Sequence, residues 1–163
     1  MLANEESAIT KVPEERWNNE AYYDSDNIKV KQGKYYCPWG GFLKDISDFD
    51  PLFFGITPKE AELMDPQERL LLESVWHVME DSGYTKEVLS HQYTEKSKQN
   101  VGVFIGCTSY TYNLIGIDEW NKGNYVTPNS LPWSLANRIS FLFNFNGPSV
   151  TLDTACSSIY PSK

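Results

Sequence analysis

V-T-L-D-T-A-C-S-S, residues 150–158, joins a short strand-like run to a cysteine with small neighbours on both sides. The run predicts a strand over 150–154, followed by a bend that presents Cys156 at the start of a helix. A helix N-terminus stabilises a thiolate through the positive end of its dipole and its unpaired amides. The same amides can face a developing oxyanion, so Cys156 is the candidate nucleophile.

The clearest helix signal lies upstream, between Asp65 and Gly83. Asp65 precedes Pro66 as an N-cap, and Gly83 is expected to end the helix in the left-handed conformation. The expected apolar face consists of Leu71, Leu72, Val75, Trp76, Val78 and Met79. We interpret the D-P-Q-E-R box at its start as helix capping rather than chemistry, with Glu68 reaching back to the cap amide.

A shorter helix precedes this one, with Thr57 as its cap, Pro58 at its first position and Glu60 reaching back. It should end before Pro66. Residues 1–34 are expected to be mainly loop, because they mix charged residues and turn formers without a period.

Residues 101–106, V-G-V-F-I-G, predict a second buried strand, and residues 107–132 predict loop with short helical pieces. The stretch W-S-L-A-N-R-I-S-F-L-F predicts a further helix with Leu135, Ile139, Leu142 and Phe143 on one face. Short helices separated by buried strands indicate a layered α/β domain.

Length and charge limit the possible functions. A chain of 163 residues suits one domain with a core. The net charge of -8 argues against binding to nucleic acid or to a membrane surface. No apolar run approaches the roughly 18 to 20 residues that span a bilayer, and the start of the chain lacks a signal pattern. We therefore expect a cytoplasmic protein.

The three cysteines, at positions 37, 107 and 156, have neither C-x-x-C spacing nor a nearby histidine pair. A disulfide framework or a metal site is therefore not expected. Cys107 is interpreted as a core residue, and Cys37 as a residue that packs beside Pro38 and Trp39. The two histidines, His77 and His91, are assigned structural or surface roles.

Several long motifs in this order point to one family. They are G-G-F-L-K-D-I-S-D-F-D-P-L-F-F-G-I at 40–56, M-D-P-Q-E-R-L-L-L-E at 64–73, L-A-N-R-I-S-F at 135–141, G-P-S at 147–149 and D-T-A-C-S-S at 153–158. Together they resemble the β-ketoacyl synthase (ketosynthase) domain of modular polyketide synthases. The resemblance implies a thiolase-like fold, a layered α/β architecture. By its position in D-T-A-C-S-S, Cys156 matches the cysteine that this family acylates.

The resemblance also implies the chemistry and the partners. Cys156 would accept an acyl chain from the phosphopantetheine arm of an acyl carrier protein. The intact enzyme would then extend the chain by decarboxylative Claisen condensation with a malonyl-type unit. No cofactor would bind directly to the chain. Expected partners are the carrier protein, the acyl thioester, other polyketide synthase domains and, through residues 135–152, a second copy in a homodimer.

The match extends from about Ala8 to Ser158, so residues 1–163 are expected to be a truncated N-terminal half of the fold. The family's first strand, its C-terminal half and the two histidines of that half would be missing. Residues 159–163 would form a tail outside the family pattern, and Pro161 would interrupt a helix there. Such a fragment is expected to lack turnover.

Two other functions fit some of these features. One is a non-catalytic interaction or scaffold module that kept the motif and lost the chemistry. The other is a thiol hydrolase, which would release free acid. Selective acylation of Cys156 distinguishes the ketosynthase interpretation from the scaffold.

Overall fold

The computed structural model describes residues 6–25, 33–84 and 101–158. The chain divides into two compact units, Met1–Ile46 and Ser47–Lys163. His91 and the tail at 159–163 lie outside the described residues, so the expectations for them remain predictions.

The first unit contains a small antiparallel sheet and one turn of helix. Strand β1 (Ile9–Lys11) pairs with β2 (Trp39–Gly41). Helix α1 (Asn19–Tyr22) is capped by the Asn18 side chain. The Trp17 ring packs edge-on against Tyr35, at 6.2 Å between centroids. Of the predicted loop at residues 1–34, the structure describes residues 6–25, 33 and 34, and there the prediction is correct apart from β1 and α1.

The second unit is built on two parallel strands. Strand β3 (Val103–Gly106) pairs with β4 (Ser149–Leu152), and Gly106 lies opposite Leu152 at their C-terminal ends. Both strands were predicted, with slightly different bounds. Side chains alternate between the two faces of this sheet. Val103 is buried on one face, whereas Phe104, Val150 and Leu152 are exposed.

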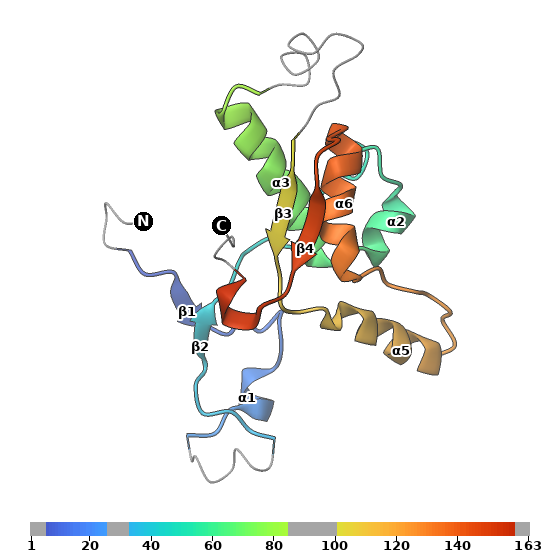
Figure 1. Ribbon diagram of the computed structural model, residues 1–163. Coiled ribbons are helices and arrows are strands. Elements are labelled where there is room, and N and C mark those ends of the chain that lie inside the picture. Colours follow the sequence, from blue (N-terminus) through green and yellow to red (C-terminus); the bar gives the residue numbers. More distant parts are fainter. Residues whose placement is uncertain (1–5, 26–32, 85–100, 159–163) are drawn as a thin grey trace. The chain divides into compact units, whose positions relative to one another are not determined.

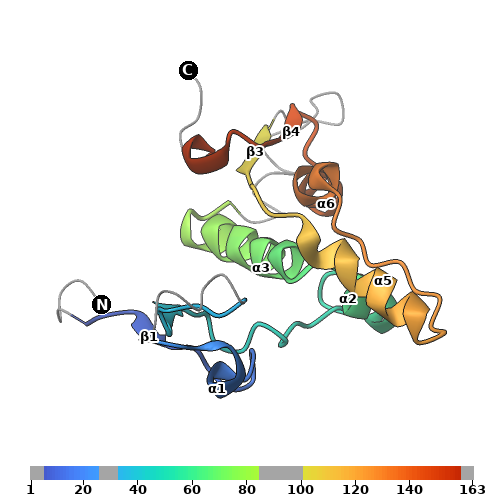
Figure 2. The same cartoon turned by 90° about the horizontal axis from the view of Figure 1, so that it is seen from below.

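Helices cover the buried face of the sheet. Helix α6 (Pro132–Phe143) packs against both strands, and α3 (Pro66–Asp81) packs against α6. Figures 1 and 2 show α6 beside β3 and β4 from two directions. The core that they enclose comprises Ile56, Ala61, Met64, Leu72, Val103, Ala136, Ile139 and Phe145. The layered α/β prediction is confirmed.

The predicted caps form, but the expected glutamate contacts do not. Helix α2 (Pro58–Leu63) begins after Thr57, whose hydroxyl accepts the Glu60 N–H at 3.2 Å. In α3 the Asp65 side chain accepts the Gln67 N–H at 2.9 Å. The N–H of Asp65 donates to the Asn129 carbonyl, so Glu68 does not reach back to it. The carboxylates of Glu60 and Glu68 instead turn toward Arg138.

The apolar face of α3 is confirmed except at one position. Leu72 is buried, and Leu71, Val75 and Met79 pack against the core. Val78 is 64% exposed, so its assignment to the buried face is wrong. Gly83 follows the helix at φ 74°, as predicted.

The segment between β3 and α6 contains two short helical elements, η3 (Thr111–Asn113) and α5 (Leu114–Asn121). Within the described ranges, none of the helices has both the length and the apolar character that crossing a bilayer would need.

Candidate active site

Cys156 lies in a tight turn directly after β4. The turn is η4 (Ala155–Ser157), a 3-10 element, and the Cys156 side chain is exposed. Ala155 adopts φ 53°, a left-handed conformation that costs a residue with a Cβ on the order of 1 kcal/mol. The predicted strand and bend are present. The expected helix is replaced, as far as Ser158, by this one turn.

Short polar side chains close the turn. The Thr154 N–H donates to the Ser158 hydroxyl at 2.9 Å, and the Ser157 hydroxyl donates to the Thr154 carbonyl at 2.8 Å. The Ala155 N–H donates to the Asp153 carboxylate at 3.1 Å. Among the described residues no acceptor receives the Cys156 N–H, so this donor can face an acyl oxygen.

The turn rests on a glycine at the end of β3. A Cβ added at Gly106 would lie 2.1 Å from the Ser158 carbonyl oxygen and 2.7 Å from its carbonyl carbon. Any side chain at this position would therefore displace the turn that carries Cys156. Gly106 ends the predicted strand V-G-V-F-I-G, but no motif in the sequence marks it as a contact of the turn.

Cys107 follows Gly106 at the same edge of the sheet. Its N–H donates to the Leu152 carbonyl at 3.0 Å, which extends the strand pairing by one residue. Its thiol lies 3.1 Å from Gln67 Oε1 and 3.7 Å from the Ser109 carbonyl oxygen. The side chain is partly exposed, so its assignment to the core is wrong.

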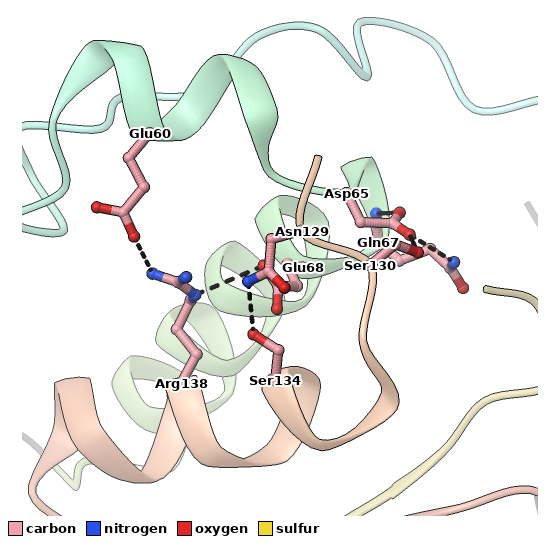
Figure 3. A network of polar contacts seen from close by, with 8 residues as sticks. All are labelled: Glu60, Asp65, Gln67, Glu68, Asn129, Ser130, Ser134 and Arg138. Carbon is pink, nitrogen blue, oxygen red and sulfur yellow. Dashed lines mark hydrogen bonds and ion pairs between the residues drawn. The ribbon is translucent and has the colours of Figure 1, made fainter. Parts of the chain in front are cut away.

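Gln67 and Asp65 connect the start of α3 to the loops around this edge, as Figure 3 shows for part of the network. Gln67 Nε2 donates to the Ser109 carbonyl at 2.8 Å and lies 3.4 Å from Asp65 Oδ2. Asp65 is buried, and its Oδ2 accepts the Ser130 hydroxyl at 2.7 Å. The box interpreted as capping therefore also holds two loops.

A buried ion pair continues the network into α6. Arg138 Nε lies 3.5 Å from Glu68 Oε2, and Arg138 Nη1 lies 2.8 Å from Glu60 Oε1 (Figure 3). Glu68 is 2% exposed, and neither of its carboxylate oxygens has a hydrogen bond of normal geometry among the described residues. Arg138 is therefore the cation that faces this buried carboxylate.

Burial is the largest influence on Glu68 and raises the pKa of its carboxyl group. The Ser134 hydroxyl and the Arg138 guanidinium oppose this shift, whereas Asp65 and Glu60 add to it. Spacing did not reveal this role, because Arg138 comes from the L-A-N-R-I-S-F motif, far along the chain. The presence of both residues in the quoted motifs was the only available signal.

Tyr110 bonds to the residue that follows β3. Its hydroxyl donates to the Cys107 carbonyl. Burial and then the nearby groups Cys107 and Asp153 raise the pKa of Tyr110. The loop after β3 and the turn after β4 therefore lie close to each other.

The other singled-out residues lie elsewhere. Cys37 is exposed, so its assignment as a packing residue is wrong. His77 is exposed on α3 and lies 3.8 Å from Glu80, in agreement with a surface role. In the part of the chain that the structure describes, no group of three His, Cys, Asp or Glu side chains could hold a metal ion.

Comparison with known protein families accounts for this arrangement. The family model described as beta-ketoacyl synthase, N-terminal domain, matches residues 1–160. The chain therefore belongs to the β-ketoacyl synthase family, and the resemblance inferred from its motifs is confirmed. The narrower limits of the domain at Ala8 and Ser158 remain predictions.

The relatives are polyketide synthases. Polyketide synthase PksL of Bacillus subtilis is 47% identical over 157 residues, which cover 96% of this chain and 3% of that protein. Polyketide synthase ThaG of Burkholderia thailandensis is 40% identical over 157 residues, again 96% of this chain and 3% of the relative. The chain thus spans a small part of the curated relatives that it matches.

Solved ketosynthase domains share the fold. The oxazolomycin ketosynthase domain OzmH KS7 of Streptomyces albus matches with a TM-score of 0.80 and 43% identity, over 92% of this chain and 25% of that one. The ketosynthase from module 6 of the Bacillus subtilis bacillaene synthase has a TM-score of 0.73 and 34% identity, over 96% and 23%. These matches confirm the predicted thiolase-like α/β fold.

Proposed function

We propose that Cys156 is the acyl acceptor of a polyketide ketosynthase. The observation that carries this proposal is the exposed cysteine in a left-handed bend at the end of a parallel strand. The small side chains around it leave room for a thioester, and the Cys156 N–H has no acceptor among the described residues. Membership of the ketosynthase family supports the same role.

In the proposed step, the Cys156 thiolate attacks the carbonyl carbon of an acyl group carried on phosphopantetheine. A new carbon–sulfur bond forms at Cys156, and the bond to the carrier sulfur breaks. The carrier leaves as a thiolate and takes up a proton from water. The Cys156 N–H donates to the acyl oxygen while it carries negative charge.

The acyl group would arrive on an acyl carrier protein, and in the intact enzyme a malonyl-type unit would extend it by decarboxylative condensation. The 163-residue chain is not expected to catalyse this second reaction. Of its two histidines, His77 lies exposed on α3 beside Glu80, and His91 lies outside the described residues. Decarboxylation of a malonyl carrier by this chain would contradict the expectation.

A homodimer is also part of the proposal. Its support is the exposed apolar surface of the sheet, where Phe104 is 61% and Val150 36% exposed, together with Phe141 of α6 at 84%. Exposed apolar groups on strands and helices are typical of surfaces that pack against another element. Sedimentation velocity of the chain tests this, and a monomer at high concentration would contradict it.

The acyl acceptor is tested by incubating the chain with an acyl-pantetheine thioester and locating the acyl group by peptide mass spectrometry. The expected result is acylation of Cys156 ahead of Cys107 and Cys37, and its loss in Cys156→Ala. Equal and slow labelling of all three cysteines would favour the scaffold alternative. Release of free acid with turnover would favour the thiol hydrolase.

A further inference from the structure

Two thiols lie at one edge of the β3–β4 sheet, and only one of them has a role in the proposed function. Cys107 follows β3 and Cys156 lies in the turn after β4. The Cys107 N–H bonds to Leu152 at the end of β4, and Gly106 contacts Ser158 of the turn. Both cysteines therefore belong to the edge at which the acyl thioester would react.

Acylation of the second sulfur would have the same bond balance as acylation of Cys156. If the Cys107 thiolate attacked the carrier thioester, one carbon–sulfur bond would form and one would break, as at Cys156. The products are again a protein thioester and a free carrier thiol. Because the same bonds form and break at both sulfurs, the surroundings of each thiol decide which cysteine is acylated.

Hydrogen bonding separates the two cysteines. The amide nitrogen of Gln67 faces two groups that can only accept, the Ser109 carbonyl at 2.8 Å and the Asp65 carboxylate at 3.4 Å. Its oxygen must then face Cys107, 3.1 Å from the sulfur. An amide oxygen only accepts, so the Cys107 S–H is the donor. Cys156, in contrast, has an exposed side chain.

Asp65 fixes the orientation of this amide. It is 4% exposed, caps α3 through the Gln67 N–H, and is itself held by the Ser130 hydroxyl at 2.7 Å. A flipped Gln67 amide would turn its oxygen toward this buried carboxylate, which is unfavourable. The acceptor that faces Cys107 is therefore built into the start of the helix.

We propose that Gln67 is a specificity-determining residue that keeps the Cys107 thiol hydrogen-bonded and thereby leaves Cys156 as the acyl acceptor. This inference rests on the proposed function. A sulfur attacks as its thiolate, so Cys107 must give up this hydrogen bond before it can react. The Ser109 carbonyl, at 3.7 Å from the sulfur, is the weaker alternative acceptor.

The test compares Gln67→Met and Gln67→Leu, which keep most of the side-chain volume and remove the amide. Alkylation rates at all three cysteines are measured in the same sample by mass spectrometry, at one pH. In both variants the Cys107 rate is expected to rise about two- to tenfold, the factor for a hydrogen bond of ordinary net strength. The alkylation rates at Cys156 and Cys37 should stay within about twofold of their wild-type values, because these thiols have no hydrogen bond to Gln67 to lose.

Glu62→Met on the exposed side of α2 is the control and should leave all three rates unchanged. An unchanged Cys107 rate in the Gln67 variants would overturn the inference. A common rise at all three cysteines would also overturn it, because Gln67 would then only support the fold. So would an equal rise in the control.

A second measurement uses the acyl-pantetheine thioester. The Gln67 variants should carry part of the acyl group on Cys107, and adding Cys107→Ala should remove that part. If the wild-type chain takes no acyl group at Cys156, the proposed function fails, whereas the alkylation comparison still decides whether Gln67 restrains Cys107.

Discussion

Cys107 and Cys156 follow neighbouring parallel strands, yet their surroundings differ in kind. Cys107 is held by side chains from a distant helix, through Gln67 and the buried Asp65. Cys156 is held by its own turn, through bonds that all lie between residues 153 and 158, and by the backbone fit against Gly106. One strand end is therefore anchored to the core, and the other presents an exposed sulfur.

The difference shows how one edge of a sheet can contain both a restrained and an available thiol. A turn of small residues leaves space for a large thioester, because the chain neighbours of Cys156, Ala155 and Ser157, are small. A polar network holds the adjacent loop in place, because the carboxylate of Asp65 fixes the direction of each hydrogen bond. Substitutions in the turn of Cys156 and in the polar network beside Cys107 should therefore have different effects.

The largest effect is expected from Cys156→Ser. A hydroxyl without an adjacent base is a far weaker nucleophile than a thiolate, so acyl capture at the turn should fall to background. Cys107→Ser should leave capture unchanged, because a hydroxyl can still donate to Gln67. Mass spectrometry after exposure to an acyl-pantetheine thioester gives both values. Normal acyl capture by the Cys156 variant would show that the turn is not the acceptor.

Gly106→Ala removes the space that the turn needs beside Gly106. The new Cβ would clash with the Ser158 backbone, and overpacking of this kind costs about 1 to 3 kcal/mol. Unfolding by urea and the alkylation rate at Cys156 should both change, whereas Cys107 should keep its hydrogen bond to Gln67.

Gly41→Ala is the matched control, because Gly41 also ends a strand and a Cβ there would meet nothing within 4 Å. It should be neutral or stabilise the chain by about 0.5 to 1 kcal/mol. Equal effects of the two substitutions would contradict the role assigned to Gly106.

The sequence predicted what local rules determine. Thr57 and Asp65 cap their helices because a side-chain oxygen reaches an amide two or three residues away, and such spacing is visible in the sequence. The strand and bend at Cys156 were also predicted from a local pattern, the residues 150–158 themselves. Family motifs then added the thiolase-like fold, which no local pattern contains.

Two of the errors share one physical cause, since each involves a partner far away in the chain. Glu60 was expected to cap its own helix, but it binds Arg138, 78 residues away. Cys107 was assigned to the core because the acceptor at Gln67 cannot be seen from I-G-C-T-S alone. Val78 fits the apolar period of α3, but it is 64% exposed.

The buried carboxyl group of Glu68 should make the stability of the chain depend on pH. Burial raises the pKa of Glu68 above its ordinary 4.5, so above pH 4.5 the unfolded state loses this proton first. The native state then binds more protons than the unfolded state. The contribution of Glu68 to the free energy of unfolding therefore falls as pH rises, until the folded-state pKa of Glu68 is passed. Glu68→Gln should remove this slope, by at most about 1.4 kcal/mol per pH unit.

Thermal unfolding measured from pH 4.5 upward gives the effect. Glu62→Gln, at an exposed position on α2, is the control and should keep the wild-type slope. The Cys156 alkylation rate at a fixed pH should be the same in both variants, because the turn makes none of its bonds to this network. An identical slope in wild type and Glu68→Gln would show that burial of Glu68 does not govern the pH dependence.

The smallest effect is expected within the turn itself. Ser158→Ala removes the hydroxyl that accepts the Thr154 N–H at 2.9 Å, and one hydrogen bond contributes about 0.5 to 1.5 kcal/mol. Ser157→Ala should cost less, because the Thr154 carbonyl that its hydroxyl bonds also accepts the Ser157 N–H at 3.3 Å. Alkylation of Cys156 and urea unfolding of both variants would establish the order. If Ser157→Ala lowers the free energy of unfolding more than Ser158→Ala, the bond to the Thr154 carbonyl holds the turn. Ser158 then acts only through its backbone contact with Gly106.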